Sequence, residues 1–145
     1  IMDKYFEANA IFSIFSRDYM QLKKDLPIRP SEMGVLNIIT KREEVFTPVM
    51  IANLLGVSKP MIANHIAVLE NKGYIYKDSS SEDRRSFHVL PTDKARILVE
   101  TEEKKLNKYL EEIEKALGKD DFNLLMSLLD RSNQVLGKMK KNRGE

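Results

Sequence analysis

The stretch TPVMIANLLGVSKPMIANHIAVLENKG, residues 47–73, constrains the fold of this chain more than any other feature. Thr47 and Ser58 are residues that commonly cap a helix, and each comes shortly before a proline that fits the first helical turn. Gly56 stands between the two helices that these signals begin, where it can adopt the left-handed conformation that ends a helix. The sequence therefore predicts two short helices joined by a tight turn.

The residues around this turn have the spacing of a helix-turn-helix motif. Ala52 lets the two helices approach, Gly56 makes the turn, and Ile62 packs the second helix against the first. At about 100° per residue, Ile62, Ile66 and Leu69 fall on one side of the second helix, and we expect them in the core.

Two short segments of alternating apolar residues follow, around residues 74–77 and 86–90, with SSSEDRR between them. This alternation favours two strands joined as a hairpin. A hairpin that directly follows a helix-turn-helix is a wing. The predicted fold class is therefore mainly α with a small β-hairpin wing.

Apolar residues at helical spacing predict four further helices. They cover residues 3–26, about 30–42, Pro91 and Thr92 to about Leu117, and about 120–140. The first and last of these carry wider apolar arcs than one core contact requires. We therefore expect the two ends of the chain to pack against a second copy of it.

Composition excludes several classes of protein. The chain has 145 residues, and the absence of cysteine excludes disulfides, thiolate metal sites and thiol-based redox sensing. No apolar run has the length of a membrane span and no secretory signal is recognisable, so we expect a soluble, cytoplasmic protein. The net charge is only +2, and the whole excess lies in residues 58–96.

No pattern of catalytic or metal-binding residues is present. His65 and His88 are the two histidines, which are too few for a zinc site without cysteine. Paired carboxylates such as Glu111 and Glu112 lie in ordinary charged runs of the long helix. We therefore expect neither an enzyme nor a bound metal or other cofactor.

The segment DRRSFHVLPTDKA, which follows LENKGYI, resembles the wing signature of the multiple-antibiotic-resistance regulator (MarR) family. Asp83 and Arg85 match the Asp-x-Arg of that signature, and Leu90 and Thr92 stand where its Leu-Thr occurs. The resemblance covers essentially the whole chain. It implies a winged helix-turn-helix transcriptional regulator, more often a repressor, that binds double-stranded DNA as a homodimer and responds to a small, often aromatic, effector.

Three positions differ from the usual pattern of the family. Asn64 replaces a common Arg or Lys, Met61 replaces a Thr or Ser, and Ala95 replaces a Gly. The base contacts of typical members therefore do not transfer to this chain. The missing cysteine also separates it from the peroxide-sensing branch.

The second helix of the motif carries the candidate DNA-reading residues. Asn can pair bidentately with adenine and Met can contact a thymine methyl in the major groove, which nominates Asn64 and Met61. His65 is expected on the flank of the same face. Pro60 is expected on the same face, and Ser58 and Lys59 lie at the start of the helix, where free amides can meet a phosphate. Met61 and His65 have a simpler alternative role as solvent-facing residues or as residues that pack at the rim of the core.

The wing carries the remaining candidates. Arg84 and Arg85 would reach the minor groove or the backbone, where the negative potential favours arginine. We expect one of them to contact DNA and the other to tie the wing to the body, and the sequence does not assign the roles. Asp83 is expected to brace the wing. The alternative is a solvated hairpin with no DNA contact.

The predicted organisation is a single MarR-like domain, residues 1–145. Its winged helix-turn-helix DNA-binding lobe covers residues 30–96, and its helical dimerisation region covers residues 3–26 and 97–141. The predicted function is sequence-specific DNA binding at an inverted repeat. The weak charge excess and the absence of a basic residue at position 64 leave one alternative, a winged-helix protein-interaction module that does not bind DNA.

Overall fold

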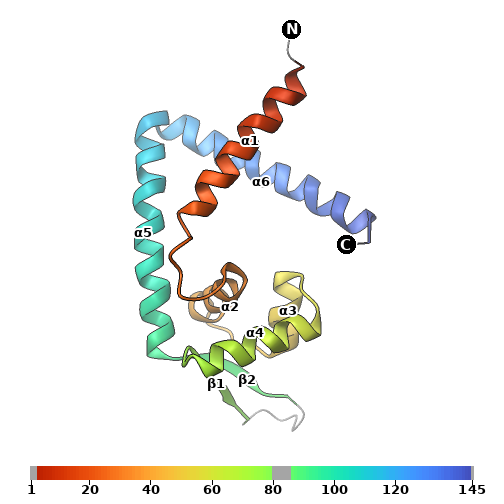
Figure 1. The fold of residues 1–145 in the computed structure, drawn as a ribbon, viewed down its shortest axis with the longest axis vertical. Helices are drawn as coiled ribbons and strands as arrows, with labels where there is room; N and C mark the ends of the chain where they lie inside the picture. The colour runs from red at the N-terminus through yellow and green to blue at the C-terminus, as the bar shows by residue number, and fades with distance from the viewer. Residues whose placement is uncertain (1–2, 80–85, 145) are drawn as a thin grey trace. The chain divides into compact units, whose positions relative to one another are not determined.

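The computed structural model of this protein describes residues 3–79 and 86–144, which form two compact units. The first unit extends to Glu102 and the second begins at Glu103, so the long helix α5 belongs to both (Figure 1). The elements are α1 (Lys4–Gln21), α2 (Pro30–Lys41), α3 (Pro48–Leu55), α4 (Lys59–Asn71), β1 (Ile75–Asp78), β2 (His88–Pro91), α5 (Asp93–Leu117) and α6 (Lys119–Asn142). The mainly helical fold class with a small hairpin is confirmed.

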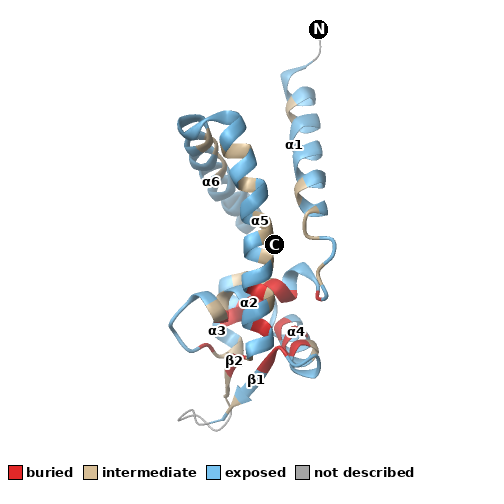
Figure 2. Ribbon diagram, turned by 90° about the vertical axis from the view of Figure 1, so that its left-hand side faces the viewer, coloured by how far each residue is buried: buried red, intermediate tan, exposed pale blue. Residues whose placement is uncertain are grey.

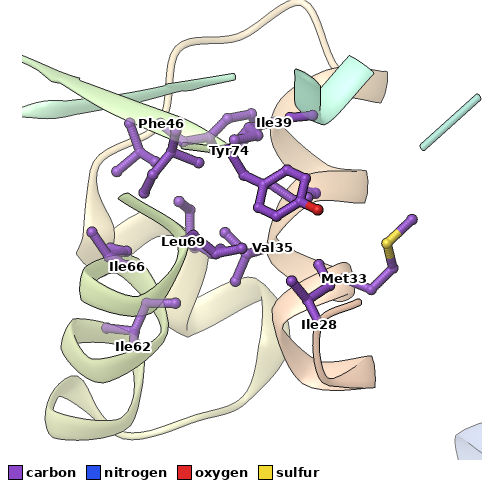
Figure 3. Close-up of a cluster of buried hydrophobic side chains, with 14 of the residues drawn as sticks. Ile28, Met33, Val35, Ile39, Phe46, Ile62, Ile66, Leu69 and Tyr74 are labelled. Carbon is purple, nitrogen blue, oxygen red and sulfur yellow. The ribbon is translucent and has the colours of Figure 1, made fainter. Parts of the chain in front are cut away.

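The core of the first unit lies where α2, α3, α4 and the hairpin meet (Figure 3). Val35 and Leu36 of α2, Ile51 of α3 and Leu69 of α4 have no exposed surface. Burying side chains of this size contributes about 1.5–3 kcal/mol each before the entropy of ordering them is subtracted. The predicted core positions of α4, including Ile62, are therefore confirmed.

The helix-turn-helix is held by the capping residues that the sequence predicted. The Thr47 hydroxyl accepts a hydrogen bond from the Met50 amide at 3.4 Å, and the Ser58 hydroxyl accepts one from the Met61 amide at 3.2 Å. Gly56 ends α3 with φ of 67°, in the left-handed region that costs other residues energy. The turn therefore fixes the direction in which α4 leaves α3.

The hairpin is antiparallel and packs one face on the core. Ile75 pairs with Pro91 and Lys77 with Val89, and Ile75 and Val89 are buried. The amide of Val89 also donates to the carbonyl of Phe46 at 2.8 Å, which joins β2 to the segment before α3. Pro91, expected to open the next helix, is instead the last residue of β2.

Thr92 makes the junction between the hairpin and α5. Its hydroxyl donates to the carbonyl of Gly73 at 2.7 Å and accepts from the amide of Ala95 at 3.3 Å. Ala95, the residue that replaces a glycine of the family pattern, is completely buried. The start of α5 is therefore anchored to the end of α4 through the hairpin junction.

The terminal helices contrast with this core. Figure 2 shows the buried residues concentrated in the α2–α4 region and the hairpin, and neither α1 nor α6 contains a buried residue. The first helix also ends at Gln21 rather than near residue 26, because its last amides turn to carbonyls three residues back. In the part of the chain that the structure describes, no helix is both long and apolar enough to span a membrane.

Candidate nucleic-acid interface

The outward side of α4 is the surface on which most candidate residues were expected. Lys59, Pro60, Met61 and Asn64 are all exposed, and Met61 as a residue is 47% exposed. Ser58, the N-cap, is exposed as well. Their exposure agrees with the helical arrangement that the sequence predicted, and their contact with DNA stays a prediction.

His65 does not lie where the sequence analysis expected it. It is only 5% exposed, and neither ring nitrogen has a hydrogen-bond partner. The placement on the exposed flank was wrong because position 65 lies within about 60° of Ile62 and Leu69 on the helix, inside the buried arc. In this structure His65 is a core residue of α4 and is not presented to a base edge.

Two small residues complete the outward side of α4 and were missed. Ala63 and Ala67 are exposed next to Asn64. Short side chains at these positions allow the helix backbone to come close to a groove floor. The helical periodicity that selected Asn64 also places Ala63 and Ala67 on this side of α4. They were not candidates because alanine has no polar atom that could bind a base.

The base of the wing is ordered by contacts along β1. The Lys77 amine lies 3.6 Å from a carboxylate oxygen of Glu70 and 4.8 Å from the centre of the Phe87 ring. Both contacts are partly exposed, so each contributes little stability and chiefly restricts the Lys77 side chain. These contacts join the hairpin to the end of α4.

The three wing candidates lie outside the described residues. Asp83, Arg84 and Arg85 belong to residues 80–85, for which the structure gives no placement. Their expected contacts with DNA and with the hairpin therefore stay predictions from the sequence.

The described residues contain no group of three or more His, Asp or Glu side chains arranged to hold a metal ion. His88 is half-buried in β2, and Glu111 and Glu112 are exposed on α5. The two histidines therefore lie on different elements of the first unit.

Residues 26–86 match the family model described as MarR family. This range begins just before α2 and ends before β2, so it covers the helix-turn-helix and the first strand of the hairpin. It includes the surface of α4 described above.

Solved structures of this fold include DNA complexes. FabT of Streptococcus pneumoniae in complex with DNA is 24% identical, with a TM-score of 0.79 over 95% of this chain and 100% of that one. The MepR–DNA complex of S. aureus is 18% identical, with a TM-score of 0.71 over 94% of this chain and 99% of that one. Wild-type MarR of E. coli in its apo form is 21% identical, with a TM-score of 0.68 over 91% and 98% of the two chains.

These likenesses extend over nearly the whole chain, whereas the family model covers α2 to β1. Residues 26–86 thus match the MarR family, and the fold of the chain is the winged helix-turn-helix fold of the solved MarR, FabT and MepR structures.

Proposed function

We propose that this protein represses transcription by binding an inverted-repeat operator as a homodimer, and that a small effector controls its release. The observation that carries the proposal is the outward face of α4, where Asn64 is exposed beside the short side chains of Ala63 and Ala67. Such a face fits the major groove, which admits one α-helix. The DNA complexes solved for FabT and MepR support the same use of the fold.

Sequence would be read by few side chains. Asn64 carries the amide that pairs with the N6 and N7 edge of adenine, and Met61 carries an exposed apolar chain suited to a thymine methyl. Ser58, Lys59 and Pro60 begin the helix, where Lys59 and the first amides meet backbone phosphate. His65 is left out of this set because it is buried.

The wing would hold the protein on the duplex. Arg84 and Arg85 follow a hairpin strand whose base is packed on the core through Ile75 and Val89. An arginine on such a wing reaches the neighbouring minor groove or its phosphates. Asp83 braces the wing in this proposal.

Dimerisation explains the exposed apolar residues of the terminal helices. They are Tyr5, Phe6, Ile11, Phe12, Ile14, Phe15 and Met20 on α1, and Leu124, Met126, Leu128, Val135, Leu136 and Met139 on α6. A two-fold dimer presents two copies of α4, so its half-sites would lie about one helical turn, or ~10 base pairs, apart. The operator would then be an inverted repeat.

Ligand control would act through linkage between two conformations of the dimer. An effector that binds better to a form with mis-spaced α4 helices weakens DNA binding by its difference in affinity for the two forms. The family resemblance implies a small aromatic compound as that effector. Repression follows if the operator overlaps the start of transcription.

The test is a fluorescence anisotropy titration of the chain on its own upstream region and on an unrelated duplex, at several salt concentrations. Asn64→Ala should cost about 1–3 kcal/mol on the preferred site and little elsewhere, with the salt slope unchanged. Arg84→Ala or Arg85→Ala should weaken binding to both duplexes alike, and the variant that loses a phosphate contact should lower the slope by about one. Asp83→Ala should weaken binding if that residue braces the wing.

The alternative function makes the opposite forecast. A winged-helix module that binds a protein partner would show no steep salt dependence on any duplex. If Arg84→Ala and Arg85→Ala both bind DNA with the affinity of the parent, the wing is only a solvated hairpin. The proposed role of α4 would be unaffected.

A further inference from the structure

A hollow of about 500 Å³ opens on the surface of the first unit, between the segment that leads into α2 and one flank of α4. Leu26, Pro27 and Ile28 form an apolar wall on one side. Arg29 and Glu32 continue that side, and Asn64, Val68 and Lys72 form the other. The hollow therefore joins the proposed base-reading face to a distant part of the chain.

The position of Asn64 determines what this hollow would meet on DNA. An α-helix with its side chains is about 10–12 Å across, and the major groove is about 12 Å wide. A helix that directs Asn64 to the base edges fills the groove, so whatever lies on its flank faces the sugar-phosphate wall. The hollow lies on that flank, because Asn64 itself lines it.

The charges around the hollow suit an anion at its rim. Arg29 is exposed and takes part in none of the ion pairs formed among the described residues. The Lys72 amine donates to the carbonyl of Pro27 at 3.2 Å, which holds the two sides together and leaves further donors on the same ammonium. The cationic side chains of Arg29 and Lys72 thus line the same hollow as the uncharged amide of Asn64.

Glu32 limits where the anion can lie. It is 3% exposed, and its carboxylate accepts a hydrogen bond from the backbone amide of Arg29 at 2.9 Å. This bond fixes the backbone from which the Arg29 side chain extends. The buried negative charge of Glu32 also keeps a second anion out of the depth of the hollow.

We propose that this hollow binds one phosphodiester group of the DNA backbone beside the base that Asn64 reads, with Arg29 as the direct contact and Lys72 as its support. The proposal rests on the proposed DNA-binding function. It adds a phosphate contact on a flank of α4 to which no other DNA contact is assigned. Such a contact carries no sequence information. It sets the depth and register of α4, so that the short Asn64 side chain reaches a base edge.

The experiment measures the salt dependence of binding for the full-length chain on its operator and on an unrelated duplex. Arg29→Ala should weaken both by a similar factor and lower the salt slope by about 0.9, the value for one phosphate contact. Arg29→Lys retains the positive charge and should keep the slope near that of the parent. Arg96→Ala removes another exposed arginine, on α5, that does not line the hollow, and it should leave the slope unchanged.

A second arm locates the phosphate. In a series of operators, one phosphate at a time is replaced by an uncharged methylphosphonate at each position that flanks a half-site. One of these replacements should lower the affinity of the parent protein. At that position Arg29→Ala should lose no further affinity. If Arg29→Ala and the parent share the same affinity and slope, the proposed phosphate contact is wrong while the proposed function stands. If the parent itself binds no duplex with steep salt dependence, the proposed function fails first.

Discussion

The amine of Lys94 donates a hydrogen bond to the backbone carbonyl of Lys72 at 2.6 Å, and it also lies 4.5 Å from the centre of the Tyr74 ring. Lys94 is in the first turn of α5, and Lys72 is the C-cap of α4. A carbonyl at the end of a helix lacks an intrahelical donor, so this bond satisfies it and ties the proposed recognition helix to α5. Through Lys72 the connection continues to the carbonyl of Pro27 and to the hollow.

We predict that Lys94→Met lowers the free energy of unfolding by about 1 kcal/mol. The substitution retains most of the aliphatic stem and removes the hydrogen bond and the charge over Tyr74. One hydrogen bond contributes a net stabilisation of about 1 kcal/mol. Urea unfolding measures it. Lys108→Met, on an exposed part of the same helix, is the matched control. If Lys94→Met and Lys108→Met have the same free energy of unfolding, the bond from Lys94 to the Lys72 carbonyl does not stabilise the fold.

We predict opposite effects for alanine at two glycines. Gly56 has φ of 67°, so Gly56→Ala should lower stability by about 1–2 kcal/mol through backbone strain, although no atom lies within 4 Å of the added Cβ. Gly137 lies within α6 and also has open space around an added Cβ, so Gly137→Ala should raise stability by about 0.5–1 kcal/mol. Thermal unfolding followed by circular dichroism compares them. A gain at Gly56 would contradict the assigned left-handed turn.

The sequence predicted this turn so well because its causes are local. A capping hydroxyl acts within three residues, and a glycine with positive φ acts on its own backbone, so Thr47, Gly56 and Ser58 could each be recognised from their neighbours. The burial of Ile62 and Leu69 follows from helical periodicity in the same way.

The parts that sequence analysis missed depend on contacts between distant segments. Arg29 and Asn64 carry no shared period or motif, and they line one hollow because α2 packs against α4. The error at His65 has a different cause. This residue was expected on the flank of the exposed face, but its angular position close to Ile62 and Leu69 puts it inside the buried arc, where it is 5% exposed.

We predict that a charge on either terminal helix separates the dimer. Phe12→Glu on α1 and Leu124→Glu on α6 replace residues that are 60% and 56% exposed in the single chain. If these faces meet a second copy, each substitution buries a carboxylate without a partner, which a dimer cannot tolerate. Sedimentation velocity should show dimers for the parent and monomers for both variants. Val49→Glu, at a residue of α3 that is 48% exposed, should stay dimeric.

A folded parental chain that sediments as a monomer would overturn this assembly. Variants that remain dimeric would instead place the interface on other surfaces of the chain.

We predict that His65→Leu stabilises the protein and leaves sequence recognition intact. Both ring nitrogens of His65 are buried without a hydrogen-bond partner, and an unsatisfied buried polar group costs about 1–3 kcal/mol. Leucine has a similar bulk and no polar atoms, so the free energy of unfolding should rise by about 1 kcal/mol in urea titrations. Because the side chain faces the core of the first unit, the preference for operator over unrelated DNA and the salt slope should equal those of the parent. Asn64→Ala, one residue earlier on the exposed face, provides the contrast, since it should relax specificity with little change in stability. If His65→Leu loses specificity at unchanged stability, the histidine turns outward when the protein binds DNA and is a base-reading residue after all.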